Sequence, residues 1–257
     1  MSELSGLLAH GPDDRGVVRL QLNRPPGNRI TIQLLEAFER TLSALHEDRG
    51  VRAVMLTATG QHFSQGADLG DARLAQAVVD HTKAVELGEL GRRVYHLWAN
   101  MPVPTVAGAR GQVIGGGLGF FGLADIRVAA ANTTLLLPEL KRGIHITWGL
   151  LPALSHTLGE QLVRYLALST RPVPVSYLPH WIVERAPNDH VEDRVSELAT
   201  RLADRPSTAA RAIVDTLRCM GRDEPDPAAL DAVRFADSMQ CPETREALMA
   251  WMTGKRG

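Results

Sequence analysis

The chain has 257 residues, of which 44% are hydrophobic and 22% charged, and its net charge of −1 gives no reason to expect a nucleic-acid partner. No segment approaches the ~20 apolar residues of a membrane helix, and the first residues lack the basic and apolar regions of a signal peptide, so we expect a cytoplasmic protein. Its two cysteines are too few for a disulfide framework or a metal site, and we expect no metal.

The first part of the chain alternates predicted strands and helices. The expected elements are a strand at 16–22, a helix at 31–46 with Thr31 as its N-cap, a strand at 51–57, a helix at 84–98, and strands at 105–108 and 125–130. Strand signals fade after about residue 152, and helices are predicted at 158–168, 189–203, 207–220 and 227–238. We therefore expect an α/β fold with a mixed core and a helical C-terminal part.

Glycines dominate the segment 111–125, in which Gly115, Gly116 and Gly117 follow an apolar run. This pattern predicts a strand, a tight turn and the start of a helix, with backbone that a ligand can approach closely. The first N–H groups of a helix lack internal partners and favour negative charge. The segment either holds an anion or a developing oxyanion, or is only a packing turn. It lacks the Gly-Lys-Ser/Thr ending of a P-loop and the acidic residue of a dinucleotide site.

A second glycine-containing turn, at 62–69, follows the predicted strand at 51–57. Alone, it is typical of a surface loop. Together with the glycine segment, it gives two backbone turns that each end a strand and can each direct one N–H at the same oxygen. Two such donors are what the stabilisation of a thioester enolate requires.

Glu139 interrupts an apolar run at 135–140, directly after Pro138. Burial of a carboxylate is costly, and desolvation would raise its pKa toward the range that is useful for proton transfer. The alternative is a solvent-facing glutamate at the start of a helix. The residues alone leave both interpretations open.

Taken in order, these segments resemble the enoyl-CoA hydratase/isomerase family, the crotonase superfamily. The resemblance rests on Arg24-Pro25 with Asn28, Phe-Ser-Gln-Gly-Ala-Asp-Leu at 63–69, the glycine segment from Gly108, Asp-Ile-Arg-Val-Ala at 125–129, and Pro138-Glu139. The tail at 235–251 also resembles the closing segment of the family. The similarity spans nearly the whole chain.

The resemblance implies a crotonase-like ββα superhelix over 1–195 and a helical C-terminal trimerisation region over 196–257, in a homotrimer or hexamer. It implies a thioester substrate, carried by coenzyme A or by an acyl carrier protein, and no separate cofactor. By position, the N–H groups of Ala67 and Gly116 form an oxyanion hole, and Glu139 is the acid/base. The substrate-binding positions are Gln65, Gly66, Asp68, Leu69, Gly115 and Gly117.

Gly119 departs from the family pattern, because typical hydratases carry a glutamate at this position. One carboxylate can shuttle one proton, which favours dehydration by a single acid/base, double-bond isomerisation or decarboxylation over two-group activation of water. Residues 116–120 and the helix with Tyr95 and Trp98 further resemble the dehydratases of polyketide β-branching cassettes. Those enzymes act on 3-hydroxy-3-methylglutaryl groups on an acyl carrier protein. The companion decarboxylases are close competitors, although they usually lack a glutamate at the position of Glu139.

Three further side chains are candidates for contact with substrate. His145 lies in the atypical segment 142–149 and is either a proton-transfer partner or structural. Tyr95 lies on a helix that borders the acyl pocket in relatives. Gln65 replaces a usual alanine, where it can narrow the pocket or bond a polar acyl group.

The leading hypothesis is a lyase of the hydratase/dehydratase type that acts on an acyl thioester, with polyketide biosynthesis as its suspected context. A Δ3,Δ2-enoyl-CoA isomerase and an acyl-thioester decarboxylase are the alternatives within enzymes. A binding or scaffold subunit with reduced catalysis, suggested by Gly119, is the alternative from another class.

Overall fold

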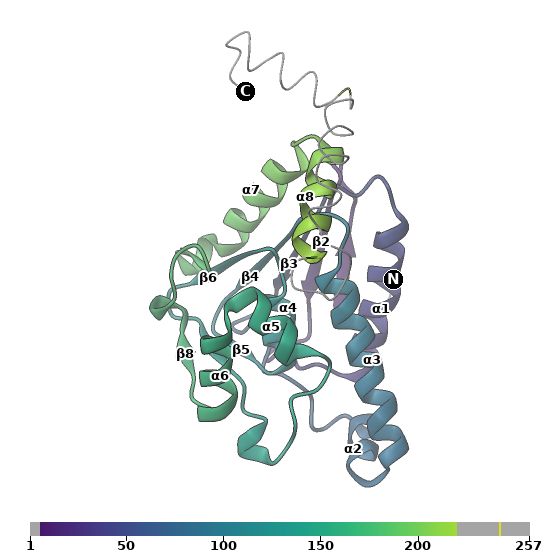
Figure 1. Cartoon of the computed structure of the whole chain (residues 1–257), viewed down its shortest axis with the longest axis vertical. Coiled ribbons are helices and arrows are strands. Elements are labelled where there is room, and N and C mark those ends of the chain that lie inside the picture. The colour runs from purple at the N-terminus through teal and green to yellow at the C-terminus, as the bar shows by residue number, and fades with distance from the viewer. Residues whose placement is uncertain (1–5, 220–241, 243–257) are drawn as a thin grey trace.

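The computed structural model describes residues 6–219 and residue 242 (Figure 1). Its strands are β1 (Leu7–His10), β2 (Val17–Leu22), β3 (Ala53–Ala58), β4 (Thr105–Ala109), β5 (Gln112–Ile114), β6 (Ile126–Ala130), β7 (Thr134–Leu136), β8 (Val173–Pro174) and β9 (Glu184–Ala186). Its α-helices are α1 (Ile32–Glu47), α2 (Ala72–Val79), α3 (His81–Ala99), α4 (Gly116–Gly122), α5 (Leu150–Leu158), α6 (Glu160–Ser169), α7 (Val191–Ala203) and α8 (Ser207–Cys219). The expected mixed α/β character is confirmed.

Two sheets organise the fold. The larger one has the order β1-β2-β3-β4-β6-β9, and the smaller one has the order β5-β7-β8. In the larger sheet only β1 is antiparallel to its neighbour, and in the smaller one β5 and β7 run parallel. Parallel neighbours need long crossover connections, and helices supply them here: α1 joins β2 to β3, and α2 with α3 joins β3 to β4.

Each face of the larger sheet buries its own apolar cluster. On one face, Phe38 and Trp98 bring α1 and α3 onto the strands. On the other face, Val195 of α7 packs with Met55 and Val106 of β3 and β4. Figure 1 shows α7 across the strands from α1 and α3. Because β3 and β4 are covered on both sides, they are buried along their whole length, which explains their nearly continuous apolar sequence.

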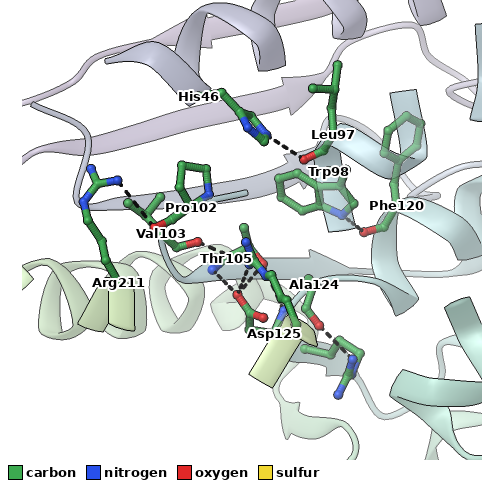
Figure 2. A network of polar contacts seen from close by, with 12 residues as sticks. His46, Leu97, Trp98, Pro102, Val103, Thr105, Phe120, Ala124, Asp125 and Arg211 are labelled. Carbon is green, nitrogen blue, oxygen red and sulfur yellow. Dashed lines mark hydrogen bonds and ion pairs between the residues drawn. The ribbon is translucent and has the colours of Figure 1, made fainter. Parts of the chain in front are cut away.

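Helix α8 is attached to the ends of the strands through two arginines. Arg211 donates to the carbonyl of Val51 at 2.7 Å. Arg218 forms an ion pair with Asp125 at 3.1 Å. The carboxylate of Asp125 also accepts from the N–H of Thr105 at 2.8 Å and from its hydroxyl at 2.9 Å, so it ties the start of β4 to the same network (Figure 2).

Most predicted elements are confirmed within a few residues. The hydroxyl of Thr31 accepts from the N–H of Leu34 at 3.1 Å, as an N-cap does. The helix predicted at 158–168 begins at Glu160, because Gly159, with a φ of 93°, separates α5 from α6. The short strands β1, β5, β7, β8 and β9 and the helices α2 and α5 were not predicted. Strands of two to four residues are too short to show a hydrophobic period.

Two predictions stay open. The helix predicted at 227–238 lies outside the described residues. The division into 1–195 and 196–257 stays a prediction, and α7, which covers the sheet, runs across that position. Among the helices of the described residues, none is long and apolar enough to cross a membrane.

Candidate active site

The candidate site lies where three parallel segments end side by side: the segment at Ser64, β5 and β7. The N–H of Ser64 donates to the carbonyl of Gln112 at 3.1 Å, and the N–H of Ile114 donates to the carbonyl of Ser64 at 2.9 Å. Strand β5 pairs in parallel with β7 on its other side, with Ile114 opposite Leu136. All three segments therefore leave their pairing at the same edge, which is where α/β folds form their ligand crevices.

The register of these segments brings the predicted catalytic residues together. Ser64 lies opposite Val113, and three residues further along the two segments, Ala67 and Gly116 lie in the wall of one cavity. Glu139 lies three residues beyond Leu136 on the third segment. A Cβ atom built on Gly115 would lie 2.8 Å from Oε1 of Glu139 and 3.9 Å from the Cα of Gly66. The carboxyl group and the turn at Gly66 therefore both lie close to Gly115.

The backbone N–H groups of Ala67 and Gly116 are unpaired. Ile30 donates to the carbonyl of Gly66 and accepts from the N–H of Asp68, both at 2.9 Å. Successive N–H groups of an extended segment point to opposite sides, so the N–H of Ala67 points away from Ile30. Gly116 is the first residue of α4 and has no intrahelical acceptor. Within residues 6–219, neither N–H has a hydrogen-bond acceptor.

The backbone at Gly115 can form only with glycine. Its φ of 53° and ψ of −122° lie in a region that side chains disfavour, and a Cβ there would strike the carboxyl group of Glu139. The N–H of Gly115 donates to the carbonyl of Leu136 at 2.9 Å, so the chain leaves the pairing and turns sharply into α4. This turn exposes the next N–H, that of Gly116.

Glu139 is partly buried, as the first of the two interpretations of its sequence context requires. It precedes a short 3-10 turn, Leu140–Arg142, rather than an α-helix. Oε2 of Glu139 is buried and has no hydrogen-bond partner in the part of the chain that the structure describes. Burial raises the pKa of Glu139 above its ordinary value, and its own backbone N–H and the charge of Arg142 only partly oppose this effect. The raised pKa makes the carboxylate a stronger base than an exposed glutamate, which suits it to accept and return a proton.

Tyr95 fills the space beside Gly119, the position at which typical hydratases carry another glutamate. A Cβ on Gly119 would lie 2.6 Å from Cε1 of Tyr95 and 2.6 Å from Cδ2 of Leu150, so no carboxylate side chain fits there. The hydroxyl of Tyr95 donates to the carbonyl of Gly116 at 2.8 Å. Burial and the nearby charge of Glu139 hold the pKa of Tyr95 well above its ordinary value, so it remains a neutral donor.

A cavity of about 780 Å³ opens over the two turns and Glu139. Its wall also includes Val85 and Arg92 of α3 and the segment 144–150. This volume is in the range of small-molecule sites. A second glutamate, Glu89, lies at the wall, but it is exposed and paired with Arg92 at 2.8 Å. Glu139 is therefore the carboxyl group next to the two unpaired N–H groups.

The structure brings most of the predicted site residues to this cavity. Its wall includes Gln65, Gly66, Ala67, Leu69, Gly115, Gly116, Glu139 and His145. The side chain of Gln65 donates to that of Gln112 at 2.8 Å, and His145 is exposed at the rim.

Asp68, Gly117 and Tyr95 lie behind the cavity wall rather than on it. Asp68 forms an ion pair with Arg24 at 2.7 Å and so supports the turn of Ala67 from behind. A Cβ on Gly117 would lie 2.6 Å from that of Ser64, which makes Gly117 a point of close packing between the two turns. Tyr95 is buried below Gly116.

Trp148 is the large side chain of the site that sequence reasoning missed. It is 8% exposed and stacks on Tyr95 with ring centroids 5.5 Å apart. A tryptophan directly before Gly149, within the atypical segment 142–149, was the available signal. The hydropathy of one residue does not show whether it lies in the core or at a ligand.

Comparisons with known proteins agree on one family. The profile of the enoyl-CoA hydratase/isomerase family matches residues 13–253. Mevalonyl-coenzyme A hydratase sidH of Aspergillus fumigatus is 30% identical over 206 residues, which cover 78% of this chain and 74% of the relative. Mitochondrial methylglutaconyl-CoA hydratase of Mus musculus is 27% identical over 248 residues, which cover 93% and 78%. The crystal structure of an enoyl-CoA hydratase of Mycobacterium smegmatis has a TM-score of 0.86 at 23% identity, covering 97% of this chain and 96% of the other.

Proposed function

The chain belongs to the enoyl-CoA hydratase/isomerase family and has the crotonase fold, and on that premise we propose that it is a lyase that dehydrates a 3-hydroxyacyl thioester with one carboxyl group. The observation that carries this proposal is the meeting of two unpaired N–H groups, those of Ala67 and Gly116, with the buried carboxyl group of Glu139. The absence of space for a second carboxylate at Gly119 supports a single proton carrier.

The two N–H groups act on the thioester oxygen. Removal of a proton from the α-carbon converts the thioester into an enolate, and the negative charge develops on this oxygen. Donors that are already fixed before the reaction stabilise that charge without reorganisation, and one such donor contributes roughly 10²–10³-fold to the rate. The hydrogen bonds around Ile30, Ser64 and Leu136 fix both turns in this way.

Glu139 acts first as base and then as acid. Its carboxylate takes the α-proton, and the C–H electron pair moves into the enolate. When the enolate collapses, the bond between the β-carbon and its hydroxyl breaks, and Glu139 returns the proton to the leaving hydroxyl, which departs as water. A raised pKa strengthens the carboxylate as a base and lets the same group hold the proton between the two steps.

For the substrate we propose a branched acyl group of the 3-hydroxy-3-methylglutaryl type, carried by coenzyme A or by an acyl carrier protein. The names of two relatives, which specify mevalonyl and methylglutaconyl thioesters, support a methyl-branched acyl group with a polar end. A role in polyketide biosynthesis and a homotrimer or hexamer remain predictions from the sequence resemblance.

A Δ3,Δ2-enoyl-CoA isomerase is the second candidate, and the same single carboxyl group favours it. In that reaction Glu139 takes the α-proton from a 3-enoyl thioester and returns it to the γ-carbon, so the double bond moves and no water is gained or lost. Oε2 of Glu139, which has no hydrogen-bond partner among the described residues, is available for such a transfer.

Mass spectrometry of thioesters incubated with the purified protein tests the proposal. With 3-hydroxy-3-methylglutaryl-CoA and the same group on a carrier protein, we expect the loss of one water, and with Glu139→Gln we expect this loss to be slower by about 10²–10⁴-fold. Loss of carbon dioxide instead would make the protein a decarboxylase. A 3-enoyl thioester that keeps its mass while its double bond moves would support the isomerase. No turnover of any of these thioesters would favour a binding or scaffold subunit.

A further inference from the structure

Trp148 lies between two cavities. The active-site cavity measures about 780 Å³. A second cavity of about 610 Å³ has Tyr95, Ala153 and Leu217 in its wall. The two cavities share three wall residues, Arg92, Trp148 and Gly149. Trp148 is therefore part of the partition that separates them.

Two glycines make room for the indole ring. A Cβ on Gly91 of α3 would lie 2.1 Å from Cδ1 of Trp148, and a Cβ on Gly116 would lie 2.5 Å from its Cζ3. Any side chain at either position would collide with the ring. The ring therefore reaches from α3 to the turn that carries one of the proposed oxyanion donors, where it closes the space next to the reacting carbonyl.

Packing rather than hydrogen bonding holds the ring in place. Trp148 stacks on Tyr95 with an angle of 20° between the ring planes. Its Nε1–H is buried and has no acceptor among the described residues, which is unfavourable for a polar group. Its backbone φ of 63° is also unfavourable for a bulky residue. The unpaired N–H and the positive φ both destabilise the fold locally. Trp148 contributes to the site by filling space.

We propose that Trp148 determines acyl-group specificity by closing the acyl side of the active-site cavity. The protein then accepts compact acyl groups, and the second cavity stays closed to the chain. This inference rests on the proposed function, because it assumes that the thioester oxygen lies at Ala67 and Gly116 and that the acyl group extends past the indole ring.

Trp148→Gly is the sharpest variant, because glycine adopts a positive φ without strain and leaves the two cavities open to each other. We expect the affinity for decanoyl-CoA relative to butyryl-CoA, measured by calorimetry, to rise by roughly tenfold or more, because the longer chain no longer collides with the wall. Leu217→Ala is the matched control, because Leu217 is part of the wall of the second cavity and not of the first. We expect it to leave the affinity ratio unchanged.

Trp148→Phe guards against a variant that fails to fold, since it keeps an aromatic ring in the wall while it removes the unpaired N–H and part of the ring volume. We expect it to keep the preference for butyryl-CoA. A cooperatively unfolding Trp148→Gly protein with the wild-type affinity ratio would overturn the proposal, and so would a tenfold shift in Leu217→Ala. Saturated thioesters are bound without reaction, so this test is independent of turnover. If wild type binds the series but dehydrates no thioester, the proposed function fails while the role of Trp148 stands.

Discussion

The two ends of the active-site cavity differ in what faces the ligand: backbone groups at one end and side chains at the other. At the proposed thioester end, backbone groups of Ala67 and Gly116 face the cavity, and main-chain hydrogen bonds around Ser64, Ile30 and Leu136 fix them. At the proposed acyl end, the wall consists of side chains from α3 and from the segment with Trp148, whose ring is held by packing.

Because of this difference, single substitutions should change the acyl specificity of the site more easily than its reaction chemistry. No side-chain substitution removes a backbone N–H, so the proposed enolate chemistry is set by the path of the chain. A wall made of side chains changes its shape with single substitutions. Substitutions at the two ends of the cavity should therefore change the reaction type and the acyl specificity of this protein independently.

Glu139→Gln is expected to have the largest effect on turnover. The amide keeps the shape of the carboxyl group but neither takes nor holds the proton, so kcat should fall by about 10²–10⁴-fold. Steady-state kinetics with the substrate identified by mass spectrometry provide the measurement. Glu89→Gln is the control, because Glu89 lies at the same cavity but is exposed and paired with Arg92. Equal losses in the two variants would argue against a proton-transfer role for Glu139.

Gly116→Ala should cause the second largest loss of kcat, because it displaces the backbone turn that carries one of the two N–H groups. The new methyl group would lie 2.5 Å from Trp148 and 2.8 Å from the hydroxyl of Tyr95, so the turn must shift. Displacement of one donor should lower kcat by about 10²–10³-fold.

Gly88→Ala tests whether any added methyl group in the cavity has the effect expected of Gly116→Ala. Its Cβ would be 3.6 Å from Oγ1 of Thr147, an ordinary contact, on a helix that favours alanine over glycine by about 1 kcal/mol. We expect nearly unchanged kcat and a higher unfolding midpoint. If Gly88→Ala impairs turnover as strongly as Gly116→Ala, the contrast between the two ends is not valid.

The same contrast between backbone and side chains explains which parts of the site the sequence could predict. Ala67, Gly116 and Glu139 lie on segments whose glycines and apolar runs mark a strand end in the sequence, and the structure brings all three to one edge. The register that aligns them depends on hydrogen bonds between β5, β7 and the segment at Ser64. Those strands are too short for the sequence to reveal the pairing.

The side chains that form the other end of the cavity were harder to predict from the sequence. Trp148 was missed, because its position depends on two distant glycines, Gly91 and Gly116, that leave space for the ring. Tyr95 was predicted to bind substrate, yet it lies under the turn of Gly116, since the buried face of α3 points toward α4 there. Such placements result from tertiary packing and not from local pattern.

Tyr95→Phe should have a smaller effect than either active-site substitution. It removes the 2.8 Å hydrogen bond to the carbonyl of Gly116 while keeping the ring that fills the space beside Gly119. The loss of one hydrogen bond costs about 1 kcal/mol of unfolding free energy. Because the bond orients the start of α4, we also expect kcat to fall, by less than in Gly116→Ala, with KM little changed. An unchanged kcat with reduced stability would assign Tyr95 a purely structural role.

The smallest effect should appear in the pH dependence of stability, and its sign is opposite for two glutamates of the same cavity. The pKa of Glu139 is raised by burial, so its contribution to folding is present below its ordinary pKa and is lost as the pH rises through the raised value. Glu139→Gln should therefore be more stable than wild type at neutral pH, and this advantage should vanish in acid. The pKa of Glu89 is lowered by its hydrogen bond with Arg92, so its contribution is present above the ordinary pKa and is lost as the pH falls. Glu89→Gln should be no more stable than wild type at neutral pH. Denaturant unfolding of the three proteins across this pH range measures both signs, and a destabilised Glu139→Gln at neutral pH would show that the carboxylate stabilises the fold rather than being held at its expense.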